Sequence, residues 1–120
     1  MDIPDPQEAT VQQYELEKLA IDHRLEGSEG KFGPLVNPLM VIAVYLYKKV
    51  KSNGLLREPM RLLHNEMLYD LNSGFNDREQ PFRLMAILTL MINLIPDDTL
   101  KLAASVCAAR EFRRLAHPCR

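Results

Sequence analysis

The sequence predicts an all-α protein, a compact orthogonal or up-down bundle of about five helices with two buried central helices. Two stretches, 39–47 and 82–95, are apolar on nearly every side of a helix, and such helices have to be surrounded by protein. A proline introduces each stretch, and proline is favoured at the first helical position. The absence of tryptophan and the 7% aromatic content favour helices over a sheet.

The chain of 120 residues, 47% of them hydrophobic, is large enough for one ordinary domain, and we expect a single helical domain over 1–120. Caps, prolines and glycines divide it. The expected helices cover about 6–25, 38–52, 58–72, 78–95 and 98–116, and a flexible linker covers 27–36.

The first expected helix, 6–25, opens on Asp5-Pro6, a cap-type residue followed by a proline, with Glu8 placed as in a capping box. Its apolar residues form two groups, separated by acidic residues. One side carries Val11, Tyr14, Ile21 and Leu25, and the other carries Leu16, Leu19 and Ala20. The sequence therefore predicts a helix that contacts two surfaces.

The second expected helix, 38–52, follows Asn37, and its closing lysines suit the negative end of the helix dipole. The third, 58–72, is expected to start at Glu58-Pro59. It is amphipathic, because its apolar residues recur at spacings of three and four. These residues are Met60, Leu63, Met67 and Leu71.

The fourth expected helix, 78–95, follows a cap-type sequence at 76–79 and ends at Pro96. The run Asp97-Asp98-Thr99 caps the fifth, 98–116, which is rich in small residues that allow close approach to a neighbour. Those small residues are Ala103, Ala104, Ala108 and Ala109.

The charges fall in separate blocks, although the net charge is only -1. Residues 1–30 carry eight acidic and two basic side chains, whereas 31–58 and 101–120 each carry five basic and one acidic. A protein that binds nucleic acid is usually basic overall. The blocks therefore favour complementary faces within the fold or within a dimer.

The expected location is cytoplasmic. No apolar run reaches the ~20 residues that cross a bilayer, and the acidic first residues do not match a signal peptide. Two cysteines, Cys107 and Cys119, cannot form a disulfide framework or a thiolate zinc site unaided.

No motif in the sequence predicts catalysis. His64-Asn65-Glu66 has the H-x-E spacing of zinc deaminases, but the downstream Pro-Cys-x-x-Cys that completes that site is absent. The glycines at 27–33 match neither dinucleotide-binding nor P-loop spacing. We expect no catalytic residue, no metal and no cofactor, and hence no enzyme.

Two sets of residues are candidates for binding. A first helix that is apolar on two sides could pack on its own bundle and engage a second chain, or it could be wedged between helices of one monomer. The expected partner-binding residues, in a homo-oligomer or with another protein, are Tyr14, Leu16, Ile21 and Leu25. The basic residues, which would bind anions or nucleic acid if the two helix ends met, are Lys48, Lys49, Lys51, Arg110, Arg113 and Arg114. The other interpretation of these cations is that helix C-termini commonly gather them and that the acidic first helix covers them.

The succession Asn37-Pro38-Leu39, a helix, Leu56-Arg57, a helix and then a third apolar helix resembles the cytoplasmic domain of DotU-type secretion-system proteins. The resemblance extends over about half of the chain and does not include the membrane anchor of that family. It assigns a role to no residue.

The function expected from the sequence is that of a small, non-enzymatic helical interaction protein that acts through protein–protein contacts and self-associates. Adaptors, chaperones and inhibitors, including viral or phage accessory proteins, are of this type. The alternative is a nucleic-acid-binding or regulatory protein that uses the basic face of the C-terminal helix.

Overall fold

The structure is a computed structural model that describes residues 6–28, 37–73 and 77–116 and, within the first helix, the side chains of 7–18. Five helices and no strand make up this part of the chain, so the predicted all-α bundle is confirmed. None of these helices is both long and apolar enough to cross a membrane. Their bounds are α1 Pro6–Ser28, α2 Pro38–Val50, α3 Gly54–Asn72, α4 Gln80–Asn93 and α5 Asp98–Ala116.

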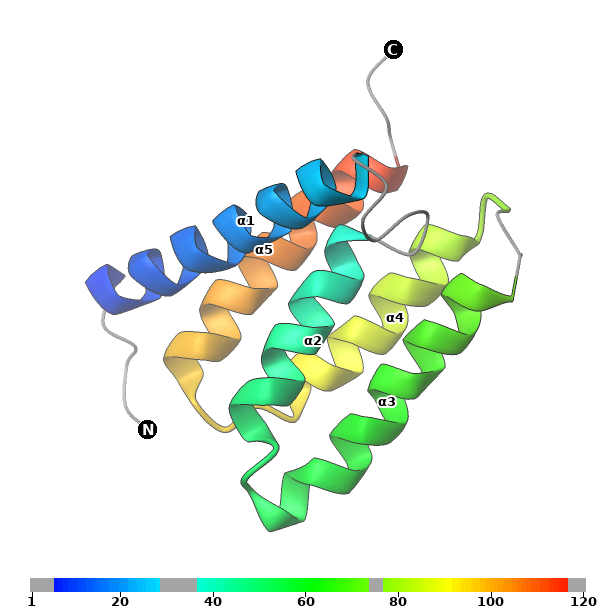
Figure 1. The fold of residues 1–120 in the computed structure, drawn as a ribbon. Helices are drawn as coiled ribbons and strands as arrows, with labels where there is room; N and C mark the ends of the chain where they lie inside the picture. The colour runs from blue at the N-terminus through cyan, green and yellow to red at the C-terminus, as the bar shows by residue number, and fades with distance from the viewer. Residues whose placement is uncertain (1–5, 29–36, 74–76, 117–120) are drawn as a thin grey trace.

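Helix α2 lies at the centre of the bundle and contacts each of the other four helices (Figure 1). Its start is fixed as predicted, because the Asn37 side chain accepts a hydrogen bond of 2.9 Å from the Leu39 N–H ahead of a proline at the first helical position. Leu39, Ile42 and Leu46 have no exposed surface. A helix with apolar residues on every side is thus surrounded by protein.

Helix α4 was also expected to be surrounded by protein, but one side of it is exposed. Leu84, Leu88 and Met91 are buried, but Phe82 and Leu90 are about half exposed. Helix α4 contacts α3, α5 and α2. Helix α1 packs on α5 and α2 instead. The outer side of α4 therefore keeps apolar residues at the surface.

Helix α3 begins earlier than the sequence predicts. The Asn53 side chain accepts a hydrogen bond of 3.0 Å from the Leu55 N–H and caps a helix that starts at Gly54. The predicted start at Glu58-Pro59 is therefore wrong, and Pro59 lies inside the helix. Proline removes the N–H that would bond the carbonyl four residues earlier. That carbonyl belongs to Leu55, which is 88% exposed, so water can hydrogen-bond to it.

The remaining bounds differ by a few residues. Helix α1 continues to Ser28, and residues 29–36 of the expected linker lie outside the described residues. Helix α2 ends at Val50, because turns at 51–52 lead into the next cap. At the start of α5, the Asp97 side chain accepts hydrogen bonds from the backbone N–H groups of Thr99 and Leu100, as predicted.

Consecutive helices from α2 to α5 run antiparallel to one another, whereas α1 and α5 run in the same direction (Figure 1). Two contacts fix the pairing of α1 with α5. The Cys107 thiol donates to the Gln13 carbonyl over 3.3 Å, and Arg110 pairs with Glu17. Ala103, Ala104 and Ala108 are buried on α5, while Ala109 is exposed. Small residues thus allow the close packing that the sequence predicts.

Candidate functional site

The outer side of α1 carries exposed apolar side chains. Tyr14 is 64% exposed and Val11 is also exposed, whereas Ala9 and Leu16 are buried on the opposite side. Leu16, at 0% exposure, belongs to the core of the bundle and cannot touch a partner while α1 is packed. Its place among the expected partner-binding residues is therefore wrong, because it lies two residues, or about 200°, around the helix from Tyr14.

Ile21 and Leu25, the other two expected partner-binding residues, have side chains outside the described part of α1. The backbone of α1 remains helical through both positions. Positions 11, 14, 18, 21 and 25 alternate steps of three and four, which is the spacing of one stripe along a helix. Their role in binding stays a prediction. We call Val11, Tyr14 and Lys18 the α1 outer stripe.

Acidic side chains border the α1 outer stripe. Glu8 and Glu15 are exposed beside it. The helix as a whole, Pro6–Ser28, carries five acidic and two basic residues. The Glu17 carboxylate is neutralised by its ion pair with Arg110 of α5. The stripe therefore has an apolar part, Val11 and Tyr14, next to the exposed Lys18, and an acidic edge formed by Glu8 and Glu15.

A second apolar surface lies across α3 and α4, and sequence reasoning missed it. Tyr69 is 73% exposed, Leu90 is 55% exposed and Leu62 is exposed to a similar degree. Tyr69 lines an open groove of about 480 Å³ together with Ala86 and Ile87 of α4. We call these five residues the α3–α4 face. Its signal in the sequence was the seven-residue spacing of Leu55, Leu62 and Tyr69, outside the buried stripe of the same helix.

Ion pairs neutralise charges around the α3–α4 face. The Arg83 guanidinium donates to Asp70 over 2.7 Å and to Asp77 over 3.1 Å, which links α4 to the end of α3 and to the connection between them. The hydrogen bond to Asp70 is the main cause of the raised pKa of Arg83. Arg61 and Glu58 form a second pair, with a hydrogen bond of 3.0 Å that lowers the pKa of the glutamate. The Arg83 pairs hold α4 against the end of α3, whereas the Arg61–Glu58 pair lies within α3. The exposed Glu66 also lines the groove.

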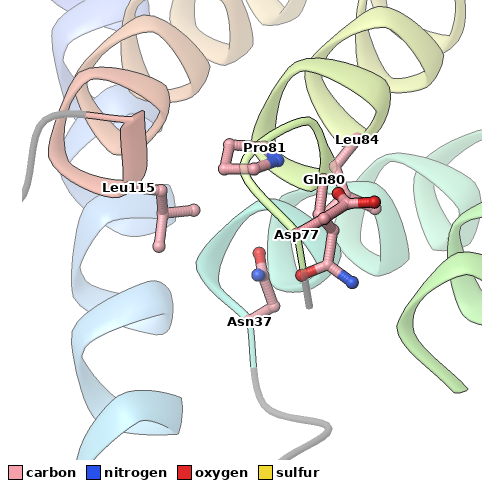
Figure 2. A pocket seen from close by; sticks show the side chains of 6 residues that line it. All are labelled: Asn37, Asp77, Gln80, Pro81, Leu84 and Leu115. Atoms are coloured by element: carbon pink, nitrogen blue, oxygen red, sulfur yellow. The ribbon is translucent and has the colours of Figure 1, made fainter. Parts of the chain in front are cut away.

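The two basic clusters are exposed but do not meet. Asn37, at the start of α2, and Leu115, near the end of α5, line one pocket (Figure 2). Lys48 lies eleven residues further along α2, roughly 16 Å away at 1.5 Å per residue. The lysines therefore occupy the opposite end of the bundle from Arg110, Arg113 and Arg114.

Two of the three arginines on α5 already have acidic partners. Arg110 pairs with Glu17 of α1, and Arg114 lies 3.7 Å from Glu111. At the other end, the Lys49 ammonium lies 5.2 Å from the centre of the Tyr45 ring. The first helix thus pairs with one of the three arginines, Arg110, and all three remain exposed.

The pocket in Figure 2 holds about 220 Å³ between the starts of α2 and α4 and the end of α5. Asn37 and Asp77 on its wall already bond to the protein: Asn37 caps α2, and Asp77 accepts from the Glu79 N–H and from Arg83. Leu84, Leu115 and Pro81 make up its apolar wall. The side chains of Asn37 and Asp77 therefore already form hydrogen bonds at the helix ends.

The chemically reactive side chains in the described ranges have structural surroundings. Burial raises the pKa of the Cys107 thiol to about 12, so it is protonated at neutral pH, whereas the nucleophile is the thiolate. The His64 ring stacks on Tyr47 at 5.3 Å between centroids, and Glu66 is exposed beside the groove. No group of three histidine, cysteine, aspartate or glutamate residues within 6–28, 37–73 and 77–116 is arranged to hold a metal ion.

Comparison of the chain with family models, with curated proteins and with solved structures finds no match. The order of elements that resembles DotU-type proteins accordingly remains a resemblance. The functional assignment depends on the two apolar surfaces and on the charges around them.

Proposed function

We propose that the protein is a non-enzymatic helical interaction protein of the adaptor, chaperone or inhibitor type, which acts through protein–protein contacts and self-associates. One observation carries the proposal. Helix α1 is buried on one side through Ala9 and Leu16 and leaves Val11 and Tyr14 exposed on the other. A helix with two apolar sides can pack on its own bundle and at the same time present an outer surface to a second protein.

The energetics support this use of the α1 outer stripe. Full burial of a large apolar side chain contributes about 1.5–3 kcal/mol, and tyrosine is enriched among the residues that dominate binding energy. Tyr14 stands on a regular helix that is fixed through α5, so little ordering of the backbone opposes binding.

The acidic border defines the partner that this stripe fits. Glu8 and Glu15 lie along one edge of the apolar residues, so a complementary surface has an apolar centre and lysine or arginine along the facing edge. An amphipathic basic helix or a groove with basic rims has this chemistry. Because charged edges contribute, we expect the affinity to decrease as salt is added.

The test is affinity capture from the native host with three matched baits, the native chain, Tyr14→Glu and Tyr14→Phe. A glutamate at position 14 places a charge in the apolar stripe, so we expect the captured protein to be lost, while the phenylalanine variant retains it. Circular dichroism of each bait controls for folding. Capture of the same protein by the native and the Tyr14→Glu baits would contradict the assignment.

The alternative function, nucleic-acid binding or regulation through the basic face of α5, is favoured by the exposure of Arg110, Arg113 and Arg114. It has less support than contact with a protein, because the lysine cluster lies at the other end of the bundle and two of these arginines pair with glutamates. Titration of generic DNA or RNA at low salt tests it, and absence of binding there rejects it.

A further inference from the structure

We propose that the protein self-associates head to tail, with the α1 outer stripe of one copy packed antiparallel on helix α5 of the next copy. The proposal rests on the self-association in the proposed function and names a second copy as the occupant of that stripe. It is carried by the order of charged and apolar side chains along the two helices.

Helix α5 has an exposed stripe of its own. Leu102 is 47% exposed, and Ala109 is exposed two turns later. Exposed charges of opposite sign stand at the two ends, an aspartate at the start of the helix and an arginine near its end. Steps of four, seven and four residues place all four side chains on one side of the helix. We call them the α5 outer stripe: Asp98, Leu102, Ala109 and Arg113.

The other sides of α5 contact its own bundle, so the α5 outer stripe faces solvent between two neighbours. Arg110 pairs with α1 on one side, and the Phe112 ring lies 5.4 Å from the Phe82 ring of α4 on the other. Phe82 is 52% exposed, so an apolar ring borders the stripe. Arg113 forms no ion pair with any side chain that the structure describes.

Both helices present an acidic residue, two apolar residues and then a basic residue. On α1 these exposed side chains are Glu8, Val11, Tyr14 and Lys18. Antiparallel packing therefore brings Glu8 toward Arg113 and Lys18 toward Asp98, with the apolar residues between them, whereas parallel packing would bring like charges together. The two patterns span ten and fifteen residues, about 15 and 22 Å, and the long lysine and arginine side chains bridge the difference of about 4 Å at each end.

The edges of the stripes select α5 as the partner of α1. Glu15 follows Tyr14 by one position and Arg110 follows Ala109 by one position, so each edge lies about 100° around its helix in the same sense. Two helices packed face to face bring such edges together when they are antiparallel. Two α1 stripes would then join acidic edges and two α5 stripes would join basic edges, whereas α1 on α5 joins opposite charges.

This contact is not reciprocal. Helices α1 and α5 lie side by side and run in the same direction (Figure 1). A twofold pair that placed α1 of each copy on α5 of the other would therefore make the two helices parallel. Antiparallel packing leaves one stripe of each kind unused in every pair, so further copies can add.

Sedimentation velocity over a concentration series at low salt tests the contact. We expect the native chain to form species larger than a dimer, and Tyr14→Glu and Arg113→Glu each to raise the dissociation constant at least tenfold. Tyr69→Glu, a matched change of an exposed tyrosine on α3, should leave association unchanged, and sodium chloride should weaken it. Circular dichroism confirms the helix content of each variant.

An equimolar mixture of the two interface variants distinguishes a head-to-tail contact from a twofold one. The Tyr14→Glu chain keeps an intact α5 outer stripe, and the Arg113→Glu chain keeps an intact α1 outer stripe. The mixture should therefore form a one-to-one dimer and nothing larger. In a twofold interface, every mixed pair would contain a damaged contact.

A native chain that stays monomeric at every concentration, a mixture that stays monomeric, or association that survives both single variants would each overturn the proposal. Capture of a different protein from the host is measured separately. A monomeric chain that still captures a partner through Tyr14 rejects only the second copy as the occupant, whereas loss of that dependence on Tyr14 counts against the proposed function.

Discussion

At the scale of single residues, helical geometry separates Tyr14 from Leu16. The two positions lie about 200° apart around α1, which puts one side chain in solvent and the other in the core. The sequence showed two apolar groups on this helix but not which of them faces the bundle. That depends on the rest of the bundle, where Leu16 joins a core cluster that includes alanines and Cys107 of α5.

The buried thiol of Cys107 predicts a dependence of stability on pH. Its pKa rises to about 12 in the folded chain, from an ordinary value of 9.0, because burial disfavours the thiolate. The unfolded chain therefore loses this proton first, and stability that is fully present below about pH 9 is lost as the pH rises toward about 12. The expected slope is at most about 1.4 kcal/mol per pH unit.

Urea unfolding of the native chain and of Cys107→Ala, from about pH 8 to about pH 10, measures this effect. All other ionisable groups are the same in both proteins, so the difference between the two slopes isolates Cys107. We expect the native chain to lose stability more steeply with pH. Parallel slopes would show that the thiol is not buried between α1 and α5.

At the scale of elements, the caps explain which boundaries could be predicted. Asn37 and Asp97 are short polar residues directly before a helix, and both cap as expected. Glu58-Pro59 resembled a helix start in sequence, but Asn53 had already started α3. Proline is tolerated at position 59 because the carbonyl that it leaves unbonded is exposed, and sequence alone does not reveal exposure.

The start of α3 can be tested with Asn53→Ala. Loss of the cap leaves the first N–H groups of the helix without their side-chain acceptor, so we expect the free energy of unfolding to fall by about 1 kcal/mol. Asn65→Ala is the control, because Asn65 is exposed in the middle of the same helix and alanine there is neutral or slightly stabilising. Equal stability of Asn53→Ala and the native chain would indicate a helix that starts later.

Contacts between residues on different helices could not be predicted from the sequence. Arg83 and Asp70 are thirteen residues apart and meet because α3 and α4 form an antiparallel hairpin. The same packing leaves Leu62, Tyr69 and Leu90 at the surface. A helix that is apolar all round indicates burial, but the number of helices available to cover it decides which side stays exposed.

At the scale of the whole molecule, one central helix organises a bundle with two separate apolar surfaces. Helix α2 contacts all four other helices, α1 packs on α5 and α2, and the α3–α4 hairpin lies on the other side of α2 (Figure 1). The α1 outer stripe and the α3–α4 face can therefore be occupied at the same time.

Hydroxyl-radical footprinting read out by mass spectrometry tests most directly which apolar side chains face outward. In dilute solution we expect strong oxidation of Tyr14, Tyr69 and Leu90 and protection of Leu16. Oxidation of Leu16 to the same extent as Tyr14 would contradict the account.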